Sequence, residues 1–197
     1  MTESIFLLKL EKRLLRDAQQ GDQLACEKIY RLYASPAYSL ARRMLTCPEH
    51  AKEATQDAFV SAFRQLSRFQ GEVPFWAWLK RIVSNASIDM IRRRKPEVSL
   101  DAMSGDAHHP SEDDGAENQL LLEQLLLSLS DEDRVIVWLH DVEGYKHREI
   151  ASQLGRSVSY SKTRLSRARA KLLCHADISN KENTADQHRL NPALKAT

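Results

Sequence analysis

The stretch FQGEVPFWAWLKRIVSNASIDMIRRRK, residues 69–95, decides the fold of the N-terminal half of the chain. It opens with a turn at Gly71 and closes with four consecutive bases, residues 92–95. Between these ends, apolar residues recur in steps of three and four, which is the spacing of one buried helical face. We therefore predict a helix here. Its buried stripe is expected to be Phe75, Leu79, Ile82, Ala86 and Met90.

The opposite side of this helix is polar and strongly basic. From Lys80 to Lys95 there are six bases and one acid, a local net charge of +5. Aromatic side chains stand just ahead of these bases, and unstacked single-stranded nucleic acid requires that combination. Helical spacing assigns Phe75 and Trp78 mainly to the core, whereas Phe69 and Trp76 lie off the stripe and are expected to be exposed. The polar residues expected to face a partner are Ser84, Asn85, Asp89 and Arg92, alongside Lys80 and Arg81.

Composition restricts the class of protein. The chain has 197 residues, 42% of them hydrophobic, and a net charge of +2, enough for one or two small cores. No apolar run is long enough to span a membrane, and the first 20 residues do not resemble a signal peptide. Three widely spaced cysteines favour reduced thiols in the cytoplasm over disulfides or a zinc site, and we expect neither metal nor cofactor. Six glycines and few strand-like alternations predict an all-α fold.

Three further helices are predicted before residue 69. They cover residues 5–20, residues from about 23 onward with Pro36 bending or interrupting the helix, and residues 49–66. Together with the basic helix they form a predicted four-helix bundle, residues 1–95. In the third helix, residues Ala54, Ala58, Val60, Ala62 and Phe63 are expected to point inward, with Glu53, Gln56 and Asp57 on the opposite side.

Composition changes sharply after the bundle. Residues 96–117 carry seven acids and no lysine or arginine, which is typical of a flexible linker. The pair His108-His109 lies in this linker without ligand-spaced partners, so we interpret it as part of a solvated loop. A second domain is predicted over residues 118–175. The tail, residues 176–197, is polar and without periodicity, and is expected to lack stable structure.

The second domain has the pattern of a helix-turn-helix. Ser130 is placed to cap a helix over residues 131–142, and Gly155 permits a tight turn between helices over residues 146–154 and 158–173. Between Gly144 and Leu173 there are eight bases and one acid, a net of +7, so the last helix suits a major groove. The side expected to face DNA consists of Lys162, Thr163, Arg164, Ser166, Arg167, Arg169 and Lys171.

These motifs, in this order, resemble those of bacterial RNA polymerase sigma factors of the extracytoplasmic-function (ECF) type. The resemblance covers about residues 10–174, as two helical domains without a third between them. The N-terminal motifs are Gly21-Asp22, Ile29-Tyr30-x-x-Tyr33, Glu53-x-x-Gln56-Asp57-Ala58-Phe59, the stretch 69–82, and Asn85-x-x-x-Asp89-x-x-Arg92-Arg93. The C-terminal motifs are Leu129-Ser130-x-x-x-Arg134, Glu143-Gly144, Glu149-Ile150-Ala151, Leu154-Gly155 and Lys162-x-Arg164-Leu165-x-Arg167-Ala168-Arg169.

The resemblance implies specific partners. The first domain would bind the β′ clamp helices of core RNA polymerase and melt the −10 promoter element around a flipped base, while the second would contact the −35 element and the β flap. The acidic linker would thread toward the polymerase active centre, and an anti-sigma factor is an expected partner. The residues implied for polymerase binding are Glu53, Gln56, Asp57 and Phe59. Those implied for the −10 element are Phe69, Gly71, Glu72, Trp76, Asn85, Asp89, Arg92 and Arg93. Those implied for the −35 element are His140, Tyr160, Lys162, Thr163, Arg164, Ser166, Arg167 and Arg169.

Several positions depart from the family pattern. Ser130 replaces a usual proline, and residues 157–161 read Ser-Val-Ser-Tyr-Ser, in which Ser157 or Ser159 can restore the cap while Tyr160 brings bulk near DNA. Lys146 replaces a capping serine. His140 replaces an arginine, so it either makes a weaker, pH-sensitive contact or is an ordinary buried or surface histidine. The alternative is a helix-turn-helix regulator that binds duplex DNA as a dimer, which leaves the face of residues 53–57 unexplained. No pattern typical of an enzyme is present.

Overall fold

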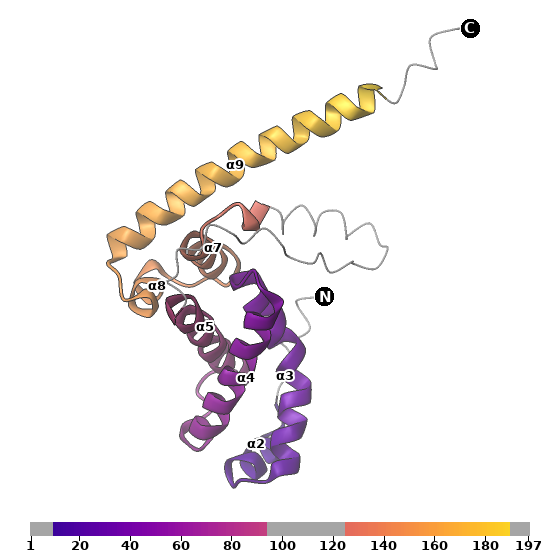
Figure 1. Cartoon of the computed structure of the whole chain (residues 1–197). Coiled ribbons are helices and arrows are strands. Elements are labelled where there is room, and N and C mark those ends of the chain that lie inside the picture. Colours follow the sequence, from indigo (N-terminus) through magenta and orange to yellow (C-terminus); the bar gives the residue numbers. More distant parts are fainter. Residues whose placement is uncertain (1–9, 94–124, 190–197) are drawn as a thin grey trace, which may run out of the picture. The chain divides into compact units, whose positions relative to one another are not determined.

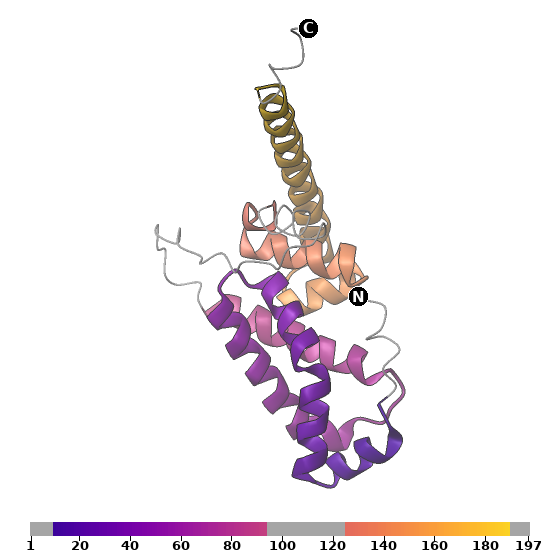
Figure 2. The same ribbon diagram turned by 90° about the vertical axis from the view of Figure 1, so that its right-hand side faces the viewer.

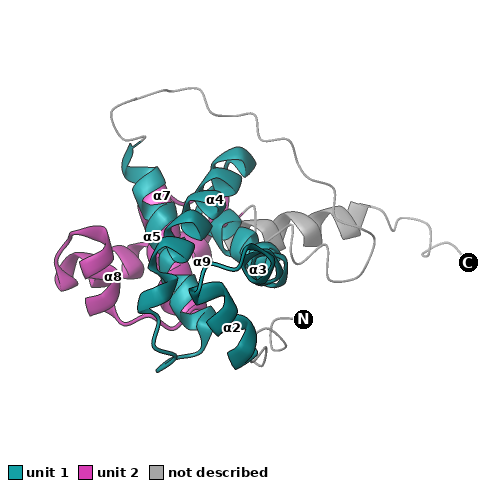
Figure 3. Cartoon of the chain, turned by 90° about the horizontal axis from the view of Figure 1, so that it is seen from below, with its two compact units in different colours: residues 1–107 teal, residues 108–197 magenta. Residues whose placement is uncertain are grey.

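The computed structural model describes residues 10–93 and 125–189, with side chains as far as residue 175. Every regular element in these ranges is a helix, as the all-α prediction requires. The chain divides into two compact units, residues 1–107 and 108–197 (Figure 3), and the boundary falls within the predicted linker, residues 96–117. That linker, with its histidine pair, lies outside the described residues.

Over residues 10–93, the described part of the N-terminal unit, four α-helices and a short 3₁₀ turn are present. Figures 1 and 2 show how these helices pack. Helices α3, α4 and α5 all contact one another, and α2 packs on α3. Asp22 caps α3, because its Oδ1 accepts hydrogen bonds from the backbone N–H groups of Leu24 (2.8 Å) and Ala25 (3.2 Å). The elements are α2 (Lys12–Gln19), α3 (Gln23–Met44), α4 (Pro48–Gln65), η1 (Leu66–Arg68) and α5 (Phe75–Arg93).

Of the two predicted effects of Pro36, bending or interruption, the structure excludes interruption of α3. The helix is continuous through Pro36, although proline lacks the N–H that would bond to the carbonyl of Leu32. Tyr33 and Ala37, on either side of the proline, are both fully buried. Burial of this face holds the helix together where its hydrogen bonding is weakest.

The buried face of α5 is rotated from the predicted one. Leu79 and Met90 are buried as expected, but Ile82 and Ala86 are half-buried, and Val83 takes the central position with 0% exposure. A shift of one residue corresponds to about 100° around a helix. Ser84 and Lys80, expected to face a partner, are buried at 0% and 9% exposure. The physical reason is that α5 packs against both α3 and α4, which widens its buried face.

Two other side chains of the bundle also differ from the prediction. In α4, Ala54, Ala58 and Ala62 point inward as expected, whereas Val60 is 49% exposed. Phe63 is half-buried. Small alanine side chains on one stripe allow α4 to lie close to its two neighbours, so its larger apolar residues are displaced to the flanks.

The C-terminal unit is the predicted helix-turn-helix preceded by a capped helix. Ser130 caps α7 (Asp131–Val137), since its Oγ accepts from the Asp133 N–H at 3.3 Å. The predicted helix over residues 131–142 then ends in a π-helical turn, η2 (Trp138–Val142), in which Trp138 Nε1 donates to Glu143 at 3.3 Å. Gly155, with φ of 62°, ends α8 (His147–Leu154) before α9 (Val158–Arg189).

The last helix is longer than predicted. It continues past Leu173 to Arg189 (Figure 1), so the expectation of an unstructured tail is wrong for residues 176–189. Residues 174–189 contain neither glycine nor proline, and nothing in that sequence stops a helix that is already formed. Along the parts of the chain that the structure describes, no helix combines the length and hydropathy needed to cross a membrane.

Candidate nucleic-acid interface

The exposed side of α5 presents a polar row at its basic end. Asn85, Asp89, Arg92 and Arg93 are all exposed, and the first three are spaced at i, i+4 and i+7, which places them on one face. Arg92 Nη1 lies 3.4 Å from Asp89 Oδ1. The row therefore offers an amide, a carboxylate and two guanidinium groups to a ligand, as the sequence predicted.

The aromatic residues proposed for this site lie in the core instead. Phe69 and Trp76 are only 8% and 7% exposed, so the expectation that they stand free is wrong. Trp76 stacks on Tyr33 of α3, with ring centroids 6.1 Å apart and planes at 7°. Phe69 packs on Phe75 and Trp78, at 5.6 and 5.0 Å between centroids. Burial among these rings also raises the pKa of Tyr33. Aromatic groups thus support the site from beneath.

The loop before α5 is held by a contact that the sequence did not reveal. Gln19 of α2 donates from its Nε2 to the backbone carbonyls of Leu66 (3.1 Å) and Phe69 (2.8 Å). The partners are about 50 residues apart in sequence, so no local pattern indicates the contact. Gly71, with φ of 78°, and Glu72 follow in the exposed part of this loop. The structure therefore fixes the base of the loop and leaves its tip open.

A second polar face lies on α4. Glu53, Gln56 and Asp57 are exposed, as predicted, but Phe59 is 3% exposed and cannot contact a partner directly. Phe59 lies between Tyr30 and Phe63, with ring centroids 4.8 and 5.8 Å away. Asp57 Oδ2 also lies 3.2 Å from Arg93 Nη2. This exposed ion pair contributes little stability. It shows that the polar face of α4 lies next to the basic end of α5.

In the C-terminal unit, one face of α9 is open to solvent. Lys162, Thr163, Ser166 and Arg167 are exposed, and the i, i+1, i+4, i+5 spacing places them side by side. Leu165 and Ala168 fill the core beneath them, at 4% and 0% exposure. The predicted cap is present, because Ser157 Oγ accepts from the Tyr160 N–H at 3.1 Å. This face has the size and charge of a recognition helix.

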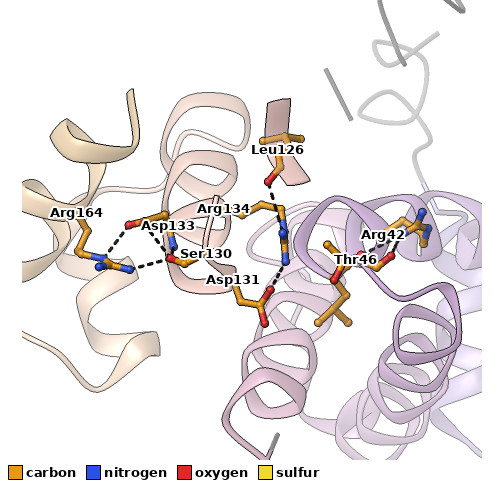
Figure 4. A network of polar contacts seen from close by, with 9 residues as sticks. Arg42, Thr46, Leu126, Ser130, Asp131, Asp133, Arg134 and Arg164 are labelled. Carbon is orange, nitrogen blue, oxygen red and sulfur yellow. Dashed lines mark hydrogen bonds and ion pairs between the residues drawn. The ribbon is translucent and has the colours of Figure 1, made fainter. Parts of the chain in front are cut away.

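Two residues predicted to face DNA are turned toward α7. Arg164 is half-buried, with its Nε 2.7 Å from Asp133 Oδ1 and its Nη2 2.9 Å from Ser130 Oγ (Figure 4). The hydroxyl of Tyr160 donates to Glu132, and this bond is the main reason that the pKa of Tyr160 is raised. The functional groups of both side chains are engaged within the unit.

Another polar cluster joins η2, α8 and α9. Asp141 accepts from Arg169 Nε at 3.0 Å and lies 2.7 Å from His140 Nδ1, and Arg169 is the main cause of its lowered pKa. The rings of His140 and His147 lie 4.4 Å apart, and His147 Nδ1 is 3.0 Å from Ser161 Oγ. Burial is the main reason that the pKa of His147 is lowered. His140 and Arg169, both predicted DNA contacts, are therefore bound to Asp141, a partner that the sequence did not reveal.

Comparison with known proteins agrees with this geometry. The family model described as Sigma-70 region 2 matches residues 29–97, and the one described as Sigma-70, region 4 matches residues 119–172. The ECF RNA polymerase sigma factor SigM of Mycobacterium tuberculosis is 32% identical over 164 residues, covering 82% of each chain. This chain belongs to the ECF sigma factor family. SigW of Bacillus subtilis, another ECF RNA polymerase sigma factor, is 31% identical over 176 residues, which cover 82% of this chain and 94% of SigW.

Solved structures support the same assignment. CnrH, solved in complex with the cytosolic domain of CnrY, is 27% identical with a TM-score of 0.51, over 84% of this sigma factor and 96% of CnrH. RpoE of Bartonella quintana, solved with the anti-sigma factor NepR, is 20% identical with a TM-score of 0.52, over 74% and 92% of the chains. The second likeness supports the fold alone. Family membership confirms the resemblance of the motifs and disfavours the dimeric operator-binding regulator.

Proposed function

We propose that this ECF sigma factor binds core RNA polymerase and directs promoter-specific initiation through two separate DNA contacts. The observation that carries the proposal is that each unit has an exposed polar face, on α5 and on α9, backed by its own core. Membership of the family indicates the function, and the exposed faces of α5 and α9 indicate which residues contact DNA. The protein acts as a transcription initiation factor without catalytic chemistry of its own.

The N-terminal unit contacts both the polymerase and the −10 element. Glu53, Gln56 and Asp57 are exposed on α4 and suit the β′ clamp helices, while Phe59 supports that surface from within. The loop carrying Gly71 and Glu72, together with Asn85, forms the site for a flipped base. Asp89 borders this site, and Arg92 and Arg93 bind backbone phosphate. Phe69 and Trp76 contribute by shaping the floor of the site.

The C-terminal unit contacts the −35 duplex and the β flap. Lys162, Thr163, Ser166 and Arg167 form its DNA-facing surface, because their functional groups are exposed on one face of α9. Long basic side chains suit phosphates and guanine edges, and the hydroxyls suit several bases. His140 and Arg169 contribute through their Asp141 cluster rather than as free groups.

An anti-sigma factor is proposed as a further partner. RpoE of Bartonella quintana was solved with the anti-sigma factor NepR, and CnrH was solved with the cytosolic domain of CnrY. The sigma factor acts where the polymerase is, so we place it in the cytoplasm. Its promoter set follows from the experiment below.

Reconstitution with core polymerase tests the proposal. The purified chain is mixed with core enzyme, and the holoenzyme is assayed for initiation on fragments of the source genome. We expect a stable complex and initiation at a small set of shared −35 and −10 sequences. Failure to co-purify with core, or initiation no more selective than that of core alone, would contradict the proposal.

One variant separates the two activities of the N-terminal unit. Asn85 is exposed on α5, so Asn85→Ala should leave the bundle and polymerase binding intact while slowing promoter opening. Opening is followed by permanganate reactivity of unpaired thymines. If Asn85 acts in melting, the variant should initiate normally on a template that is already unpaired over the −10 element. Loss of core binding would show instead that Asn85 is structural.

A further inference from the structure

The acidic first turn of α7 reaches across to α9. Glu132 accepts from the hydroxyl of Tyr160 and lies 3.8 Å from Arg156 Nη2, while Asp133 pairs with Arg164 at 2.7 Å. Carboxylates are favoured at a helix N-terminus, so this turn is a stable anchor. Two consecutive acids of α7 therefore hold the start of the recognition helix.

Tyr160 is the centre of this contact. Its ring lies beside two guanidinium groups, with Arg156 at 5.4 Å and Arg164 at 5.8 Å from the ring centroid. Its backbone N–H is bonded to the Ser157 cap at 3.1 Å, and its hydroxyl is bonded to Glu132. The side chain is half-buried, and hydrogen bonds hold the residue both at its backbone and at its hydroxyl. A base contact would require it to give up the bond to a carboxylate, which is among the stronger hydrogen bonds.

We propose that Tyr160 is a positioning residue, which fixes the first turns of α9 on α7 through Glu132 and so sets how the recognition helix meets the −35 element. The proposal rests on the proposed function of α9. Hydrogen bonds to base edges tolerate only small errors in position, so the orientation of α9 decides which base each side chain favours. The groups that Tyr160 positions are Lys162, Thr163, Ser166 and Arg167.

The charge of Glu132 makes the proposal sharply testable. A carboxylate near the DNA-binding helix repels phosphate, so electrostatics alone predicts that removing it tightens binding at every sequence. A positioning role predicts that its removal lowers discrimination between sequences, even where overall affinity rises. Electrostatics alone therefore leaves discrimination between sequences unchanged, whereas positioning lowers it, and discrimination can be measured separately from affinity.

The experiment uses holoenzyme and a pool of promoter duplexes randomised over the −35 element. Bound duplexes are sequenced for the wild type, Tyr160→Phe, Glu132→Ala, Glu132→Gln and the double variant Tyr160→Phe/Glu132→Ala. We expect Tyr160→Phe and Glu132→Ala each to lower discrimination roughly three- to tenfold, which is less than the full worth of a charge-assisted hydrogen bond because the bond acts only through the position of α9. The double variant should lose no more than either, because both remove the same bond. Glu132→Gln keeps an acceptor oxygen and should restore most of the discrimination.

Controls keep the outcomes distinct. Tyr38→Phe removes a phenol hydroxyl from the N-terminal unit and should leave the base preferences unchanged, and thermal unfolding of each variant checks the fold. Additive losses in the double variant, or a change of base preference in Tyr160→Phe that Glu132→Ala does not share, would show that Tyr160 reads DNA directly and overturn the proposal. Unchanged discrimination in all variants would also overturn it. A wild-type holoenzyme without any −35 preference would instead contradict the proposed function of α9.

Discussion

Arg164 and Arg167 lie one turn apart on α9 but differ in what their guanidinium groups contact. Arg167 is exposed, whereas Arg164 is held by Asp133 and Ser130. We predict that Arg167→Ala, like Lys162→Ala, weakens binding of holoenzyme to its −35 duplex by about 1–3 kcal/mol without loss of stability. Equilibrium binding at fixed salt measures the effect. Unchanged occupancy would remove both residues from the interface.

Arg164→Ala provides the contrasting case. Asp133 is 3% exposed, and loss of its partner leaves a buried carboxylate poorly compensated. We predict that Arg164→Ala lowers the free energy of unfolding of the C-terminal unit by about 1–3 kcal/mol. Urea denaturation measures it, with Arg167→Ala as the matched control. A drop in DNA binding with no loss of stability would assign Arg164 to the interface instead.

His147 gives the C-terminal unit a pH dependence. Burial, the neighbouring His140, Lys162 and Arg169 lower its pKa below the ordinary 6.5, against the opposing effect of Asp141. Below about pH 6.5 the unfolded chain therefore binds a proton that the folded chain resists, so stability falls as the pH drops toward the folded-state pKa and then levels off. Urea denaturation between about pH 7.5 and about pH 5.5 should show this loss. His147→Gln should flatten the curve, and an identical slope in that variant would contradict the prediction.

At the scale of the element, helix starts depend on single capping residues. Asp22 accepts two backbone hydrogen bonds at the start of α3, the longest helix of the bundle. We predict that Asp22→Ala lowers the free energy of unfolding of the N-terminal unit by about 0.5–2 kcal/mol. Asp22→Asn should lose only a few tenths of that, because asparagine caps as well. Equal losses in urea denaturation would show that charge, not capping, matters.

Helix ends marked by a capping residue or a glycine were predictable because these signals are local. The C-terminal end of α9, which has no such signal, and the phase of α5 were not predictable. Asp22, Ser130 and Gly155 marked the correct boundaries from their own chemistry. Which face of α5 is buried depends on its packing against α3 and α4. Because Trp76 stacks on Tyr33 of α3, it lies in the core. Phe69, also expected to be exposed, lies in the core against Phe75 and Trp78 of α5.

The candidate site shows the same difference between features that local sequence signals predict and features that depend on the fold. Polar groups on the outside of a helix, such as Asn85 and Arg167, were placed correctly, since their exposure follows from the charge pattern. The residues that hold the site in position were missed. Gln19, Glu132 and Asp141 each act across a fold-dependent distance that no sequence spacing encodes.

At the scale of the whole molecule, the two proposed DNA contacts lie in different units joined through the segment 96–117. Joining two contacts raises the effective concentration of the second contact once the first has formed. The overall affinity can then exceed that of either contact alone by roughly 10²–10⁴-fold. We predict that cutting a protease site inserted in this segment lowers promoter-specific initiation at least about tenfold. The uncut protein with the same insertion is the control. Full initiation after cleavage would show that polymerase alone aligns the two halves.

The placement of the three tryptophans has a spectroscopic consequence. Trp76, stacked on Tyr33, and Trp78 belong to the N-terminal unit, whereas Trp138 belongs to the C-terminal unit. With selective excitation of tryptophan, a Trp138→Phe variant would therefore show tryptophan emission only from the N-terminal unit, and a variant with phenylalanine at both other positions only from the C-terminal one. Intrinsic fluorescence can thus follow each half of the same chain as it engages polymerase, without an added label.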